Sequence, residues 1–245
     1  MNYRPSPFAG LPPVTKNLLI INALFLLATW VLRHTFGFDL SNYLGLYFPM
    51  SDNFHPAQFG TYMFMHADFM HLFFNMFALF MFGRILEAYW GPKKFFIYYV
   101  ITGVGAGVLQ LVFKYIDYQN AISLLTAEQI EIVYEQGAQA LREYKNFTNP
   151  EMRNFNSVLN QGMVGASGAV FGILLAFGML FPNTELMLLF PPIPIKAKYF
   201  VMIYGVAELF LGVANFQYDN VAHWAHLGGM AFGFLLIKYW EKRGI

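Results

Sequence analysis

The chain has 245 residues, a formal net charge of +1 and no cysteine, and 57% of its residues are hydrophobic while only 12% are charged. Soluble domains carry roughly 25% charged residues, so this composition is suited to lipid rather than water as the main solvent. The lack of cysteine excludes disulfides, thiolate catalysis and cysteine-based metal sites, and the balanced charge gives no reason to expect nucleic acid as a partner.

Six apolar segments are long enough to cross about 30 Å of hydrocarbon at a helical rise of about 1.5 Å per residue. They cover residues 18–36, 69–88, 95–113, 163–181, 199–214 and 221–240, and the fifth is the shortest. The proline-rich start is polar, and no small-residue cleavage site follows the first apolar run, so we do not expect a cleavable signal peptide. We expect an all-α polytopic membrane protein, with residues 1–245 forming a single domain of six transmembrane helices.

Two of the connections between these segments are long. Residues 37–65 are rich in aromatic residues and contain no Lys or Arg, which favours loop or interfacial structure. Residues 114–161 are polar and carry five glutamates. Within them, Thr126 and Gln129 have the spacing of a capping box, which predicts a helix start. We therefore expect a helical insert between the third and fourth segments, lying on the membrane surface.

The distribution of positive charge predicts the orientation. One side of the membrane receives ten basic residues: Arg4, Lys16, Arg84, Lys93, Lys94, Lys196, Lys198, Lys238, Lys242 and Arg243. The other side receives five: Arg33, Lys114, Arg142, Lys145 and Arg153. Both termini, including segment 1–16, are therefore expected in the cytoplasm, with the insert 114–161 outside. The second, fourth and sixth segments then all begin on the outer side, at similar depth.

Polar residues occur at the outer starts of these three segments. The second holds His71 and Asn75, which are four residues apart and so share one helix face. The fourth holds Ser167 and the sixth holds His226. Small residues form a stripe in each of two segments, namely Gly168, Gly172 and Ala176 in the fourth, and Gly229 and Gly233 after His226 in the sixth. Such stripes let membrane helices approach closely, which would bring Ser167 and His226 together.

A serine and a histidine in contact have a specific chemistry. A serine hydroxyl is a poor nucleophile until a neighbouring base takes its proton, and neutral imidazole is suited to that task. The oxyanion that forms needs donors, which an Asn amide, a His N–H and the backbone N–H at a helix start can supply. Every Asp lies in a loop or ahead of the second segment, so the residues indicate a Ser–His dyad rather than a triad.

Each of these residues also has a simpler interpretation. Ser167 alone is typical of helix packing, His226 alone fits a proton relay, and Asn75 alone fits a helix–helix hydrogen bond. A structural role is expected for His66, His223 and Glu87, while Glu208 in the fifth segment is either structural or part of a gate. The sequence has no H-E-x-x-H motif, and no carboxylate is clearly placed to complete a zinc site with His66, His71, His223 and His226. We therefore expect neither a metal nor a cofactor.

Three stretches of the sequence, "HADFMHLFFN", "GASG" and "AHLGGMAFG", occur in order on the second, fourth and sixth segments. They resemble the signature segments of the rhomboid intramembrane serine proteases of the basic six-span bacterial type. The resemblance implies that Ser167 is the nucleophile and His226 the general base, and that His71, Asn75 and the Ser167 N–H stabilise the oxyanion. It also implies that Gly165 leaves room for the substrate backbone.

The resemblance implies a serine endopeptidase of the cell inner membrane, which cleaves transmembrane helices of single-span or polytopic proteins near their outer end through an acyl-enzyme. Substrates would enter sideways from the lipid bilayer, with Phe200, Tyr204, Glu208 and Phe210 of the fifth segment as the candidate gate. The chain departs from the family in two places: residues 37–65 lack a frequent Trp-Arg pair, and the insert 114–161 is long.

Two other functions remain open from the sequence. A catalytically silent relative would bind membrane-protein clients, and such relatives usually lack the serine or the histidine. A small transporter with a histidine proton relay would show internal symmetry between its halves, and none is visible. Labelling by a fluorophosphonate, lost in Ser167→Ala, separates the protease from both.

Overall fold

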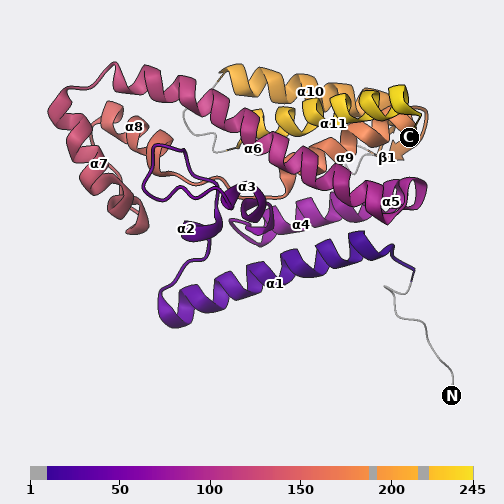
Figure 1. Cartoon of the computed structure of the whole chain (residues 1–245), viewed down its shortest axis with the longest axis horizontal. Helices are drawn as coiled ribbons and strands as arrows, with labels where there is room; N and C mark the ends of the chain where they lie inside the picture. The colour runs from indigo at the N-terminus through magenta and orange to yellow at the C-terminus, as the bar shows by residue number, and fades with distance from the viewer. Residues whose placement is uncertain (1–9, 188–191, 215–220, 245) are drawn as a thin grey trace.

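The computed structural model describes residues 10–187, 192–214 and 221–244, and nearly all of this chain is helical (Figure 1). The helices are α1 (Pro13–Phe36), α2 (Ser41–Leu44), α3 (Gln58–Thr61), the 3₁₀ turn η1 (Tyr62–Phe64), α4 (Phe69–Ala78), the π-helical turn η2 (Leu79–Gly83), α5 (Arg84–Trp90), α6 (Pro92–Ile122), α7 (Ala127–Arg142), α8 (Pro150–Asn160), α9 (Ser167–Leu180), α10 (Ala197–Ala214) and α11 (His223–Arg243). Two short antiparallel strands, β1 (Glu185–Met187) and β2 (Pro194–Lys196), join α9 to α10, so the prediction of an all-α chain is correct except for this strand pair.

Each of the six predicted apolar segments contains a helix, and the chain is a multi-pass membrane protein. Four helices are long and apolar enough to cross a membrane: α1, residues 69–90, α6 and α10. The apolar helix α9 is shorter, with 14 residues. The helix α11 has 21 residues, but its two histidines and its charged last turn lower its hydropathy. Of the predicted cytoplasmic segment 1–16, residues 1–9 lie outside the described residues, and α1 already begins at Pro13.

Carboxylates cap the starts of two helices. Asp68 is the N-cap of α4 and accepts a hydrogen bond from the His71 N–H. Glu87 lies in α5 and is 2% exposed. Its carboxylate accepts from the backbone N–H groups of Val14 and Thr15 at 2.8 and 2.7 Å, and from the Thr15 hydroxyl at 2.8 Å. Glu87 therefore caps the start of α1, which confirms the structural hydrogen-bonding role expected for it.

The centre of the bundle is α6, which lies between α11, α9 and the first loop (Figure 1). The small residues of α9 face α6 rather than α11, because a side chain at Gly168 would meet Ala106 and one at Gly172 would meet Thr102. On α11, a side chain at Gly229 would collide with the Gly168 carbonyl. The two predicted stripes therefore do not pair along their length: α9 and α11 touch closely at Gly168 and Gly229, whereas Gly172 and Gly233 both face α6.

Gln58 organises the first long loop, residues 37–65. Its amide is 2% exposed and makes four hydrogen bonds inside the loop. The amide nitrogen donates to the carbonyls of Tyr43 and Asn53, and the amide oxygen accepts from the N–H groups of Tyr47 and His55. This network supports a loop that contains neither Trp nor Arg.

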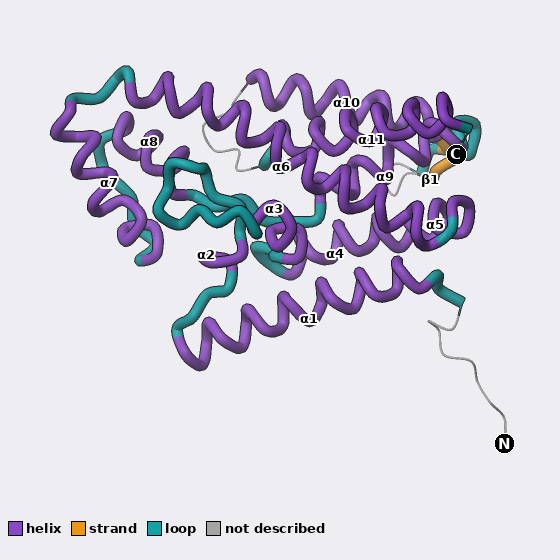
Figure 2. Tube along the Cα trace, in the orientation of Figure 1, coloured by secondary structure: helices purple, strands orange, loops and turns teal. Residues whose placement is uncertain are grey.

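The insert is a pair of helices packed against the end of α6 (Figure 2). The prediction that α7 begins at a capping box is confirmed, since Thr126 and Gln129 exchange both hydrogen bonds. The helix α6 continues to Ile122, past the predicted start of the insert at residue 114. The fully buried Phe155 of α8 packs against Tyr118 of α6, and Asn160 accepts from the Ser51 hydroxyl at 2.9 Å. The insert is thus joined both to α6 and to the first loop.

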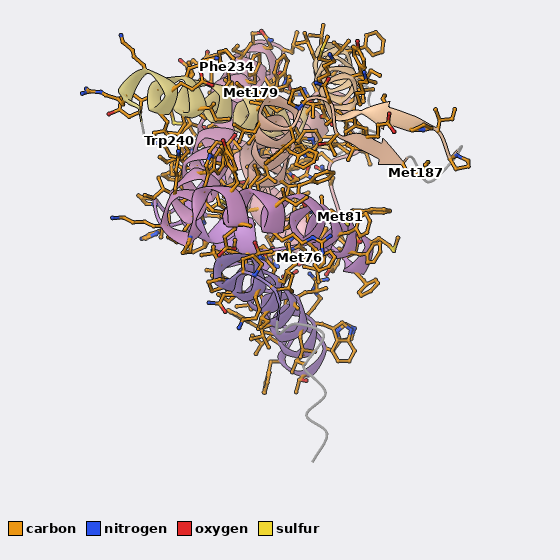
Figure 3. The ribbon with its side chains drawn as sticks, turned by 90° about the vertical axis from the view of Figure 1, so that its right-hand side faces the viewer. Met76, Met81, Met179, Met187, Phe234 and Trp240 are labelled. Atoms are coloured by element: carbon orange, nitrogen blue, oxygen red, sulfur yellow. The ribbon has the colours of Figure 1, made fainter. Side chains whose placement is uncertain are left out.

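Viewed from the end that carries the C-terminus, the bundle shows its helices close to end-on, and the strand pair projects sideways with Met187 (Figure 3). Many large apolar side chains on the outer faces are exposed, among them Leu24 and Trp30 of α1 and Val206 and Phe210 of α10. Exposed apolar surface on this scale is typical of helices surrounded by lipid.

Candidate active site

Ser167 is the first residue of α9, with Ala166 as the N-cap. The sequence placed the start of this segment at residue 163, but residues 163–165 are extended: Met163 forms a bridge with Leu46, and the Gly165 N–H donates to the Tyr62 carbonyl at 3.0 Å. Ser167 therefore lies at the helix start itself. The first N–H groups of a helix have no acceptor within the helix, so those of Ser167 and Gly168 are donors next to the half-buried Ser167 hydroxyl.

The predicted contact between α9 and α11 is present. The Nε2 atom of His226 lies 2.9 Å from the Oγ atom of Ser167. The ring of Phe171, one turn after Ser167, stacks on the His226 ring at a centroid distance of 4.1 Å and an interplanar angle of 7°. The apolar ring covers one face of the imidazole and restricts its rotation. Its i+4 spacing from Ser167 is the signal by which Phe171 could have been identified from the sequence.

The other side of His226 contacts a carboxylate. The Nδ1 atom of His226 lies 2.9 Å from the Oε2 atom of Glu208, and Nδ1 of His223 lies 2.6 Å from the same oxygen. All three side chains are buried, with 7–8% of each residue exposed. A Ser–His dyad was expected because no Asp is placed to complete a triad. In the structure a glutamate contacts the histidine instead, and Ser167, His226 and Glu208 form a continuous hydrogen-bonded chain.

From the sequence, Glu208 was expected to be a structural or gating residue and not a partner of His226, because its helix runs in the opposite direction. The three helices that carry His71, Ser167 and His226 hold these polar groups in their first turns. The helix α10 begins at the other end of the bundle, so a residue in its second half reaches the same level (Figure 1). An ionisable residue within an apolar segment is a functional-site candidate by default, and this signal was available for Glu208.

His71 and Gly165 meet beside Ser167. Gly165 has φ +128°, a backbone conformation that L side chains rarely adopt. A Cβ atom there would lie 2.7 Å from Nε2 of His71 and 3.6 Å from Oγ of Ser167. Nδ1 of His71 accepts a long hydrogen bond, 3.4 Å, from the Ala67 N–H. Nε2 of His71 is therefore the protonated nitrogen and can donate into the space that the absent Cβ leaves open.

Two other predicted residues lie around His71. Asn75 is buried, and its amide donates to the His71 carbonyl at 2.9 Å. Among the contacts of the described residues, none joins Asn75 directly to Ser167. His66 packs edge-on against the His71 ring at a centroid distance of 5.0 Å. Burial, with the neighbouring His71, lowers the pKa of His66 to about 4, so this imidazole is neutral and suited to a packing role.

The described residues contain a group of potential metal ligands next to Ser167. The group that brings three potential ligands together is Glu208, His223 and His226, whose ligand atoms lie within 4.8 Å of one another. The sequence analysis considered a different set, which included His66 and His71 and lacked a carboxylate. The hydrogen bonds from both histidines to Glu208 use the same atoms that would bind a cation, so the two arrangements are alternatives.

The sequence matches the model of a known protein family. The family model for the Rhomboid domain matches residues 53–242, which contain every residue of the site described above. The first 52 residues, including all of α1, lie outside the match.

Three relatives have recognisable sequence similarity to the chain. A mitochondrial rhomboid protein of Schizosaccharomyces pombe is 39% identical over 90 residues, which cover 34% of this chain and 23% of the relative. Rhomboid protein 1, mitochondrial, of Saccharomyces cerevisiae is 27% identical over 179 residues, with 73% and 40% covered. Rhomboid protease AarA of Providencia stuartii is 27% identical over 182 residues, with 71% and 52% covered. The aligned part is about a quarter to a half of the length of these relatives.

Proposed function

The chain belongs to the rhomboid family, and from that premise we propose that it is an intramembrane serine endopeptidase that cleaves transmembrane helices of membrane proteins near their outer end. The observation that carries the proposal is the 2.9 Å contact between Ser167 Oγ and His226 Nε2. The similarity to a relative named as a rhomboid protease supports it.

The proposed topology has six transmembrane helices in one domain of residues 1–245. It comprises α1, the helix at residues 69–90, α6, α9, α10 and α11, with the insert outside and both termini in the cytoplasm of a cell whose inner membrane holds the protein. The charge distribution supports this orientation. The short helix α9 is compatible with it, because the extended residues 163–165 ahead of Ser167 are covered by the first loop.

In the proposed reaction, Nε2 of His226 accepts the hydroxyl proton of Ser167 while Oγ attacks the scissile carbonyl. The C–N bond then breaks, and the leaving amine takes the proton from His226. The acyl-enzyme is released when His226 activates a water molecule that attacks the ester. No cofactor or metal is required by these steps.

The oxyanion is proposed to lie in the space at Gly165. The donors that support this are His71 Nε2–H, the Ser167 N–H and the neighbouring Gly168 N–H. Removing one such donor costs about 10²–10³ in rate in comparable acyl-transfer sites. Asn75 is proposed to support the oxyanion site through His71, because its amide donates a hydrogen bond to the His71 carbonyl.

Substrates are proposed to be helices of single-span or polytopic proteins that enter sideways from the bilayer past α10. Peptide groups in a lipid-embedded helix are internally hydrogen-bonded, so small or helix-breaking residues near the cut should favour cleavage. On α10, Tyr204 contacts both Phe200 and Phe171, and Phe210 is 65% exposed. Replacing Phe200 or Tyr204 by Ala should open this route and raise cleavage.

The proposal is tested by reconstituting the protein in liposomes with a panel of single-span proteins. Wild type should produce a defined cut near the outer end of at least one of them, and Ser167→Ala should produce none. Binding of the panel without cleavage by wild type would instead favour a catalytically silent protein that handles membrane-protein clients.

A further inference from the structure

Glu208 occupies an unusual position, because a buried carboxylate on the lipid-facing helix α10 contacts two histidines of α11. Its Oε2 atom lies 2.6 Å from Nδ1 of His223 and 2.9 Å from Nδ1 of His226. Residues of this kind inside a membrane segment are costly to bury unless they are paired. The pairing partner here is the imidazole that also contacts Ser167.

These contacts determine which nitrogen of each histidine carries the proton. An ionised carboxylate only accepts hydrogen bonds, so Nδ1 of His226 must donate to it. Nε2 of His226 is then unprotonated and faces the Ser167 hydroxyl as an acceptor, which is the form a general base needs. His223 donates to the same oxygen and so holds the carboxylate in place without touching Ser167. His71 has the opposite tautomer, with Nε2 as the donor.

The attachment of α10 to the rest of the protein is slight. Of its 18 residues, the buried ones are Ala197, Val201 and Glu208. Ala197 and Val201 lie in the first turns, where they cover Gly178 of α9. Glu208 is thus the buried residue in the second half of the helix. Its large exposed apolar residues are Tyr199, Met202, Ile203, Tyr204, Val206, Leu209, Phe210 and Val213.

We propose that Glu208 is a positioning residue for the reaction proposed above, and that it supports His226 only while α10 lies against α11. The carboxylate fixes the tautomer and orientation of His226 and stabilises the imidazolium formed when Ser167 attacks. An outward movement of the second half of α10 would withdraw the carboxylate. The state that admits a substrate past α10 and the state that cleaves it are then different, and cleavage waits for α10 to return.

The first test replaces Glu208 in the full-length protein. A fluorophosphonate labels Ser167 as Oγ displaces fluoride from phosphorus and His226 takes the hydroxyl proton, so its rate reports the base without a transmembrane substrate. Glu208→Gln and Glu208→Leu should each lower the labelling rate and kcat together by about 10²-fold, within the range that general acid–base catalysis supplies. KM should stay within about twofold, because α10 still binds the same substrate.

The matched control is His223→Gln, which removes a contact to the same Glu208 oxygen but leaves the His226 contact. It should lose much less labelling than Glu208→Gln at a comparable melting temperature. Equal losses in the two variants, or a Glu208→Gln labelling rate within threefold of wild type, would overturn the positioning role. Labelling of wild type that is lost with a chelator and restored by Zn²⁺ would overturn it as well, in favour of a cation at this cluster. A wild type that neither labels nor cleaves would instead refute the proposed function itself.

The second test separates α10 from α11 without changing Glu208. A Cβ atom at Gly212 would lie 3.3 Å from Cβ of His223 and 3.3 Å from the Trp224 ring, so Gly212→Leu acts as a wedge between the two helices. The coupling predicts that this variant labels at least tenfold more slowly than wild type. Val213→Leu, at a 69% exposed neighbouring position, should label normally. A Gly212→Leu protein that labels as fast as wild type or faster would show that α10 acts only as a barrier.

Discussion

The substitution Gly165→Ala tests the geometry around the nucleophile. Gly165 has φ +128°, and a non-glycine residue held in a sparsely populated backbone region costs about 1–3 kcal/mol. The added methyl group would also lie 2.7 Å from Nε2 of His71. The segment that carries Ser167 must therefore shift, or His71 must turn away. A misplacement of about 1 Å can cost about 10²-fold in rate, so we expect labelling and cleavage to fall by about ten- to hundredfold.

The assay is the rate of fluorophosphonate labelling in detergent, measured together with the melting temperature. The control is Gly60→Ala in α3, because a Cβ atom at Gly60 has no neighbour within 4 Å and no positive φ is involved. Gly60→Ala should match wild type in both measurements. If Gly165→Ala labels at the wild-type rate, the space beside Ser167 is not the oxyanion site and this reasoning fails.

Two further outcomes follow from contacts outside the reacting atoms. Phe171→Ala removes the ring stacked on His226 and should slow labelling about three- to tenfold, because such a ring pair contributes ~0.5–1.5 kcal/mol. The control Phe234→Ala, on the exposed face of α11, should label at the wild-type rate. Equal labelling rates in the two variants would show that the stacking is unimportant. Gln58→Leu leaves buried polar groups of the loop unpaired and should destabilise the protein by about 2–4 kcal/mol. Its melting temperature should therefore be lower than that of the control Gln161→Leu. An unchanged melting temperature would contradict the role of Gln58 in the loop.

The contact between Ser167 and His226 was predictable because two simple rules applied to it. The hydropathy pattern located six helices, and the charge distribution put the starts of the second, fourth and sixth at one level. Polar residues in their first turns could therefore meet. The search for polar residues in first turns does not apply to α10, because this helix runs in the opposite direction and Glu208 lies in its second half. Glu208 was therefore recognised only as a structural or gating residue.

Other features depend on packing that leaves no periodic pattern. The helix α6 is apolar nearly all round, so its sequence does not reveal that it forms the centre of the bundle. The start of α9 was placed four residues too early, because residues 163–165 are as apolar as a helix but are held extended by Leu46 and Tyr62. The four hydrogen bonds of Gln58 join residues spread over a loop, and no local motif predicts them.

The most direct test of the central claim is to locate a fluorophosphonate adduct by mass spectrometry in the folded protein. The account predicts a single adduct on Ser167 in wild type and its loss in His226→Ala, because His226 must take the serine proton. An adduct on another residue, or equal labelling of Ser167 without His226, would contradict the claim that these two side chains form a working nucleophile and base.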